Sequence, residues 1–209
     1  MNHKKLTIAL AIALFYEILF KLSRNFASNI FEIPLLSSIT KLLSVAVGLI
    51  IILFLYYFYQ EEKDGGAIEL VLKVILGLFI LHFIFRQLLP LRITGFKTLR
   101  YIGEILGYVQ AILFFILLIF YKSKIPAREK SLVQATFLLT IMFGFAILKS
   151  FYSLITFTRF ILFGTIIQHP ITFYNILFVL FVLTHLSIIY FLYWYYVYKF
   201  NPNKKALEI

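Results

Sequence analysis

The sequence predicts an all-α membrane protein, a polytopic bundle of transmembrane helices, on the strength of its composition and of the length of its apolar runs. Hydrophobic residues make up 62% of the 209 residues and the mean hydropathy is +0.96, whereas a soluble domain is about half apolar. The apolar runs reach roughly 18 residues or more, the length at which a helix crosses a bilayer. A soluble α/β core would show shorter runs broken by polar faces.

Charged or proline-containing segments divide the apolar sequence into six predicted spans. The segment from Gln60 to Gly66 holds three acids and a Gly-Gly pair, Pro90 ends another run, and four bases and a proline lie between Lys122 and Lys130. These segments are too short to form a soluble domain, so residues 1–209 are predicted to be one transmembrane domain. The predicted spans are about 6–22, 42–59, 68–89, 101–121, 132–152 and 172–198.

Residues 153–168 decide between six and seven spans. They are apolar but contain Arg159, and a seventh span would place that guanidinium near the bilayer centre at a cost of at least about 2.5–3.5 kcal/mol. The additional turn would also have to form at Lys149 and Ser150, without a glycine or a proline. We therefore expect six spans and an interfacial or re-entrant helix near 153–168, with seven spans as the alternative.

The basic residues predict the topology. The formal net charge is +11, and its cations cluster at the ends of the apolar runs, which points to anionic lipid headgroups rather than nucleic acid as their partners. With six spans, the loops on the side of the termini carry ten Lys and Arg and the opposite loops carry seven. The ten are Lys4, Lys5, Lys63, Lys122, Lys124, Arg128, Lys130, Lys199, Lys204 and Lys205; the seven are Lys21, Arg24, Lys41, Arg92, Lys97, Arg100 and Arg159. The excess predicts that both termini are cytoplasmic.

Several classes of chemistry have no residues to carry them. The chain has no cysteine, and Asp64 is its only aspartate, which excludes thiol nucleophiles and disfavours sites built on paired aspartates. No P-loop, dinucleotide-binding, zinc-protease or nucleophile-elbow motif occurs. We predict no catalytic residue, and a protein that is not an enzyme is favoured.

Ionisable residues within spans are the candidate functional residues, because an unpaired charge in hydrocarbon is costly. We select Glu17, His82, Arg86 and His185 as candidates for a transport or ligand path. His82 lies 14 residues after position 68 and His185 lies 14 residues before position 199, so both lie roughly 21 Å from the same side. They could bind haem b as axial ligands, hold a metal ion or relay protons. Alternatively, each histidine is hydrogen-bonded separately to a backbone carbonyl or a hydroxyl such as that of Thr184.

Two further features predict contacts outside the bilayer core. Lys122, Lys124, Arg128 and Lys130 crowd one short loop and could bind lipid headgroups or a partner's acidic face. The run from Tyr190 to Phe200 is dense in tyrosine and contains the only tryptophan, which is typical of an aromatic belt at the membrane interface.

A transport or permeation protein, or the membrane subunit of a larger transporter, is the function that these patterns favour. It agrees with six spans, sparse intramembrane charges and the absence of a soluble domain. One alternative is a membrane-embedded scaffold or sensor subunit, to which a cytoplasmic partner docks through the basic loop. The other is an electron-transfer subunit with haem b between His82 and His185.

Overall fold

All regular structure in the described part of the chain is helical. The computed structural model describes residues 3–26, 34–62, 66–85, 97–163 and 171–200. Six helices follow one another in these ranges: α1 (His3–Phe26), α2 (Pro34–Glu62), α3 (Ala67–Phe83), α4 (Lys97–Lys124), α5 (Lys130–Phe163) and α6 (Ile171–Phe200).

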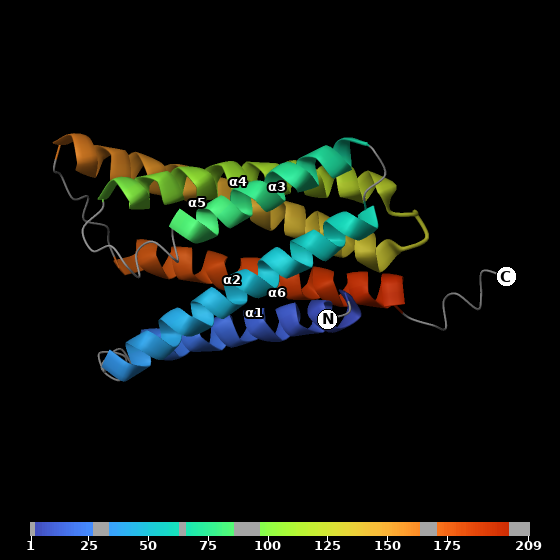
Figure 1. The fold of residues 1–209 in the computed structure, drawn as a ribbon, viewed down its shortest axis with the longest axis horizontal. Helices are drawn as coiled ribbons and strands as arrows, with labels where there is room; N and C mark the ends of the chain where they lie inside the picture. The colour runs from blue at the N-terminus through green and yellow to red at the C-terminus, as the bar shows by residue number, and fades with distance from the viewer. Residues whose placement is uncertain (1–2, 27–33, 63–65, 86–96, 164–170, 201–209) are drawn as a thin grey trace.

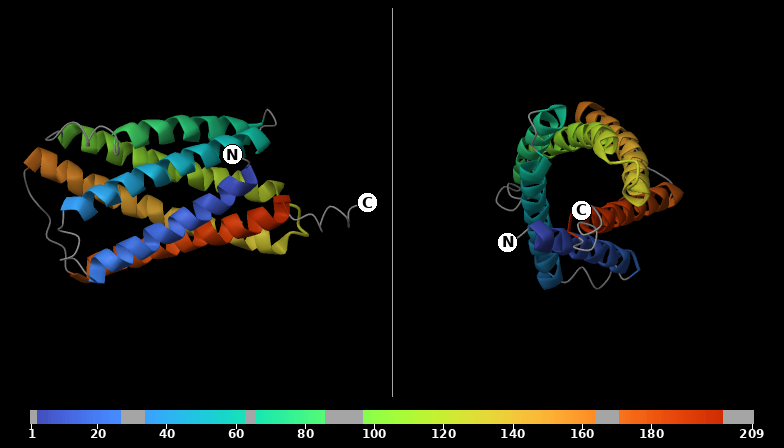
Figure 2. Two further views of the ribbon diagram at one scale, coloured as in Figure 1. Left: turned by 60° about the horizontal axis from the view of Figure 1, so that its bottom comes forward. Right: turned by 90° about the vertical axis from the view of Figure 1, so that its right-hand side faces the viewer.

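The six helices form a closed ring. Each helix packs against the helices before and after it in the chain, and α1 packs against α6 to complete the circle. Successive helices run in opposite directions, so that both termini lie at one end (Figure 1). A view along the helices shows the ring directly, with α3 on the side opposite α6 (Figure 2).

Five of the helices are long and apolar enough to cross a membrane. Their outer faces remain apolar, as Ile12, Leu70 and Leu148 show, each with about two thirds of its surface exposed. Such faces suit lipid rather than water. The length and composition of these five helices are those of a helical membrane protein. The five segments are His3–Ser23, Ser44–Glu62, Ile102–Lys124, Lys130–Thr156 and Asn175–Phe200.

Helix α3 is as apolar as the other five but shorter in the described residues. It has 17 residues, and the sequence from residue 86 lies outside the described ranges. Its start follows the sequence signals, since Gly66 precedes it in an extended conformation. At the other hairpin, Pro126 accepts a hydrogen bond of 2.9 Å from the backbone N–H of Glu129 and so turns the chain from α4 into α5.

The predicted interfacial or re-entrant helix near 153–168 is wrong for residues 153–163. Those residues continue α5 without a break, and no turn forms at Lys149 or Ser150; residues 164–170 lie outside the described ranges. The physical reason is length. A helix that starts at Lys130 reaches Arg159 after about 44 Å, beyond a hydrocarbon core of about 30 Å. Arg159 is exposed, and neither re-entry nor a seventh span is needed to keep it from the bilayer centre.

Candidate functional site

A cavity of about 350 Å³ lies inside the ring. All six helices contribute to its lining, and the largest share comes from one stripe of α4. No charged side chain lines it among the described residues. The α4 stripe consists of Gly107, Gln110, Ala111, Phe114, Leu117, Leu118 and Tyr121. These positions recur every three or four residues, the spacing of one helix face. The stripe rises about 21 Å from its first to its last residue, so the cavity is elongated along the ring.

His82 and Gln110 form the polar pair in the lining. The Nδ1 atom of His82 on α3 lies 2.6 Å from Oε1 of Gln110 on α4. Because an amide oxygen can only accept, this contact places a proton on Nδ1. The Gln110 side chain is buried at 5% exposure, and its Nε2 makes no hydrogen bond in the described part of the protein.

Gly107 lies beside the His82 ring. A methyl group at position 107 would lie 3.4 Å from His82 Cε1, which is an ordinary van der Waals contact.

A second polar pair joins α1 to α6. The Nδ1 atom of His185 lies 2.9 Å from the carbonyl oxygen of Phe181, and its Nε2 lies 3.5 Å from Oε2 of Glu17. The carbonyl can only accept, so Nδ1 carries a proton. Nε2 and the carboxyl group attract each other only if they share a second proton, either as imidazolium and carboxylate or as imidazole and carboxylic acid. One turn farther along α1, the Lys21 ammonium lies 3.4 Å from the centre of the Phe181 ring.

The pair of Glu17 and His185 should show measurable energetic coupling. We expect a double-mutant cycle with Glu17→Gln and His185→Gln to give a coupling of about 1 kcal/mol, because both groups lie in one partly buried contact between helices. Thermal unfolding in detergent would measure it. The matched control is the Glu69–Lys73 ion pair of 2.8 Å, which lies along one helix with Lys73 56% exposed; its coupling should be clearly smaller, because solvent screens exposed ion pairs. Equal coupling in the two cycles would contradict this assignment.

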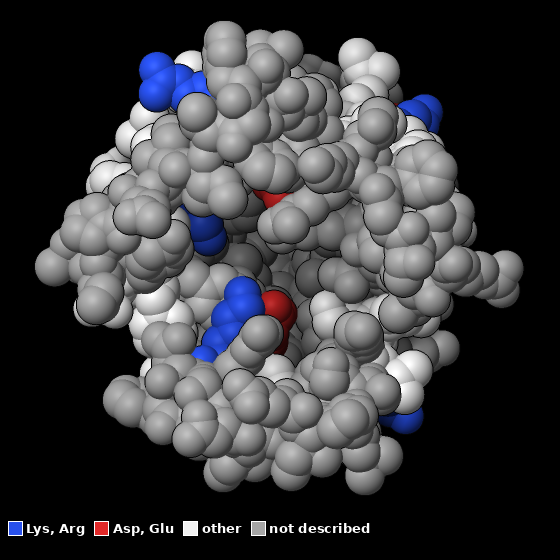
Figure 3. Space-filling view, turned by 90° about the vertical axis from the view of Figure 1, so that its left-hand side faces the viewer, with Lys and Arg blue, Asp and Glu red and all other residues white. Residues whose placement is uncertain are grey.

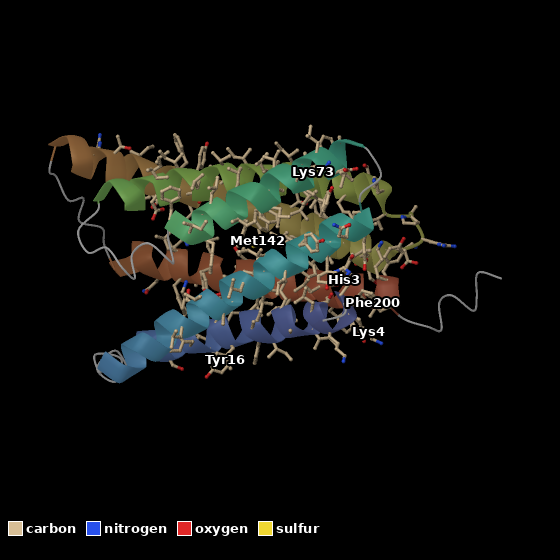
Figure 4. The ribbon with its side chains drawn as sticks, viewed as in Figure 1. His3, Lys4, Tyr16, Lys73, Met142 and Phe200 are labelled. Atoms are coloured by element: carbon tan, nitrogen blue, oxygen red, sulfur yellow. The ribbon has the colours of Figure 1, made fainter. Side chains whose placement is uncertain are left out.

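A third polar cluster joins α1, α2 and α6 at the end that carries the termini. The His3 ring, which is 4% exposed, hydrogen-bonds to Oε1 of Glu61. Tyr195 donates a 3.2 Å hydrogen bond to Oε2 of the same carboxyl group. Phe200 meets the His3 ring edge-on, with ring centres 5.5 Å apart, and Figure 4 shows the two side chains together at this end.

Aromatic rings separate this cluster from the cavity. Tyr195 is fully buried and does not line the cavity, but its ring packs on Phe54, Phe58 and Phe191, which do. These rings close the cavity toward the termini. Figure 3 shows a hollow at the opposite end, in which a few basic and acidic side chains are visible.

The aromatic run from Tyr190 to Phe200 therefore has two faces. Tyr193 is 58% exposed and suits the predicted interfacial belt, whereas Tyr195 belongs to the core. Lys199, which we expected to meet anionic lipid, instead forms an ion pair of 2.7 Å with Glu62.

In the structure, the candidate residues His82 and His185 do not share a partner. His82 contacts Gln110 and lines the cavity, whereas His185 contacts Glu17 and the backbone of its own helix. They lie on helices at opposite sides of the ring. His185 has the backbone carbonyl partner that we considered for it, whereas His82 contacts a side-chain amide instead. Among the described residues, no three His, Asp or Glu side chains gather as a metal site. Arg86 lies outside the described residues.

The four basic residues of the loop flank the connection from α4 to α5. Lys122, Lys124, Arg128 and Lys130 are all exposed at the end that carries the termini. The Lys122 ammonium lies 4.6 Å from the centre of the Phe137 ring. Their exposure leaves them accessible to lipid headgroups or to a partner.

Sequence reasoning missed Gln110, His3 and Glu61. Gln110 carried a signal, because it is the one amide within the apolar run 101–121. His3 and Glu61 lie 58 positions apart in segments that read as a tail and a loop, and no local pattern predicts that they meet. Comparison with known proteins finds no matching family model, no matching curated protein and no matching solved structure.

Proposed function

We propose that this protein is a membrane transport protein, or the cargo-binding membrane subunit of a transporter, whose cargo occupies the cavity within the helix ring. The cavity is the observation that carries the proposal. Helical cores pack to nearly crystalline density, and voids larger than a water molecule are few. A cavity of about 350 Å³ with lining from every helix falls within the size range of small-molecule sites.

Two polar pairs lie in or near the proposed cargo path. His82 supplies an imidazole ring in the lining, and the Glu17 carboxyl group lies 3.5 Å from the His185 ring in a contact between α1 and α6. Intramembrane groups of this kind are typical of proton relays and ion pathways. The cargo cavity is thus accompanied by groups that could couple its occupancy to protonation.

The proposal includes six spans with both termini in the cytoplasm. Its support is the alternating direction of the six helices, together with the basic side chains of the α4–α5 connection at the end of the ring that carries the termini. A scaffold or sensor would share this topology. It would not require the cavity to open toward both sides of the membrane.

Cysteine accessibility tests the proposal, since the chain has no cysteine of its own. Ala111→Cys places a thiol in the cavity lining. We expect it to react with a membrane-impermeant thiol reagent added from either side of oriented vesicles, because transport requires the cavity to open to each side in turn. Lys124→Cys should react from the cytoplasmic side only and so reports the orientation.

The matched control is Ala135→Cys, because Ala135 is fully buried on α5 and does not line the cavity. It should stay unreactive from both sides. Reaction of Ala111→Cys from a single side would refute transport and would favour the scaffold or sensor subunit instead. Reaction of Lys124→Cys from the outer side alone would refute the orientation.

A further inference from the structure

The amide of Gln110 indicates what the cavity binds. This side chain is 5% exposed and lies in the lining. Its Oε1 is engaged by His82 at 2.6 Å, and its Nε2 makes no hydrogen bond in the described part of the protein. A buried amide N–H without an acceptor is destabilising, and an apolar cavity is a poor site for water. A ligand with an oxygen acceptor would satisfy this group.

The remainder of the lining restricts the rest of the ligand. Most of it is leucine, isoleucine, phenylalanine and alanine, with Tyr121 and Ser150 as further polar residues, and no Asp, Glu, Lys or Arg side chain lines the cavity among the described residues. A charged ligand would lose its hydration there without gaining a counter-charge. The ligand must therefore be uncharged, and most of its surface must be hydrocarbon.

The position of the polar pair gives the ligand an orientation. Gln110 lies on the first turn of the α4 stripe, and Tyr121 lies at its other end, beside the aromatic rings that close the cavity. About 16 Å of helix rise separates the two residues, and the side chains between them are apolar. An elongated molecule would therefore place its oxygen at Gln110 and its hydrocarbon toward the termini.

We infer that the cavity binds an uncharged, elongated apolar molecule through a single hydroxyl or carbonyl oxygen that accepts a hydrogen bond from the Gln110 amide. This inference rests on the proposed function, because it assigns a ligand class to the same cavity. A hydroxyl group fits either orientation of the amide, since it both accepts and donates.

Photolabelling in nanodiscs tests the ligand class with a decanol that carries a diazirine on its hydrocarbon chain. We expect labels on lining residues such as Phe114 and Leu117. Unlabelled decanol should compete, whereas decanoate and decylammonium at the same mole fraction in the lipid should not. Competition by decanoate equal to that by decanol would overturn the inference, because it would show that charge is accepted.

Gln110→Leu removes the hydrogen bond and keeps a side chain of similar size. We expect it to weaken labelling by the decanol probe roughly tenfold, the effect of one lost hydrogen bond. A decane probe with the same diazirine should label this variant as well as the wild type, which verifies that the cavity is intact. The matched control is Gln134→Leu, since Gln134 is exposed on α5, and it should leave both probes unaffected.

The outcomes separate this inference from the proposed function. Unchanged decanol labelling in Gln110→Leu would overturn the ligand class, even if Ala111→Cys reacts from both sides of the membrane. Gln110-dependent labelling supports the ligand class, and it does so even if Ala111→Cys reacts from one side, a result that refutes transport alone. Loss of decane labelling in Gln110→Leu would overturn the inference as well, because the role of Gln110 would then be structural.

Discussion

Replacing Tyr195 by alanine should lower the free energy of unfolding by about 3–5 kcal/mol, the range for truncating a fully buried aromatic side chain. The Tyr195 ring is 0% exposed and packs on Phe58 with ring centres 5.4 Å apart. The substitution would also remove the 3.2 Å hydrogen bond to Glu61. Thermal unfolding in detergent would measure the loss.

Tyr193→Ala is the matched control for this substitution. Tyr193 lies two residues earlier on α6 and is 58% exposed, so its removal should cost less than about 1 kcal/mol, as for other exposed positions. Tyr195→Phe separates the hydroxyl group from the ring and should cost about 1 kcal/mol, the contribution of one hydrogen bond. Equal losses for Tyr193→Ala and Tyr195→Ala would show that α6 is rotated from the orientation described above.

Gly48→Ala should destabilise the protein by about 1–3 kcal/mol, because it overfills the contact between α2 and α3. A methyl group at this position would lie 2.6 Å from Cδ2 of Phe83, a side chain that is itself buried at 7% exposure. Thermal unfolding would measure the effect. Adding Phe83→Leu to Gly48→Ala should recover part of the loss, since the smaller side chain makes room for the methyl group.

Gly77→Ala, on the other helix of the α2–α3 hairpin, should have the opposite effect on stability. No atom lies within 4 Å of a methyl group at Gly77, so alanine adds helix propensity without a clash and should stabilise by about 0.5–1 kcal/mol. Destabilisation by Gly77→Ala, or a neutral Gly48→Ala, would contradict the packing of α3 against α2.

Local sequence patterns predicted most of the helices. The long apolar runs predict helices of membrane-spanning length, and Gly66 and Pro126 lie at the helix ends where the sequence suggests breaks. The prediction was wrong at 153–163, where the cost of burying Arg159 led us to expect an interfacial or re-entrant helix after the fifth span. Helix length decided otherwise, since Arg159 lies on a continuous helix beyond the thickness of the bilayer core.

The candidate site was predicted only in part. Glu17, His82 and His185 were selected as ionisable residues within spans, and each has a polar partner on another helix. The matching depth of His82 and His185 was a weaker signal that they share a ligand. Depth follows from sequence position, whereas the direction in which a side chain points around the ring depends on how each helix is rotated.

The sequence by itself determined that this chain forms long apolar helices of the membrane type and which few polar groups they carry, because hydrophobicity and helix rise are local properties. Only the tertiary structure decided that the helices close into a ring around a cavity. The same holds for the pairing of His82 with Gln110, of His185 with Glu17 and of His3 with Glu61. Those contacts depend on the rotation and order of packed helices, which no periodicity within one helix specifies.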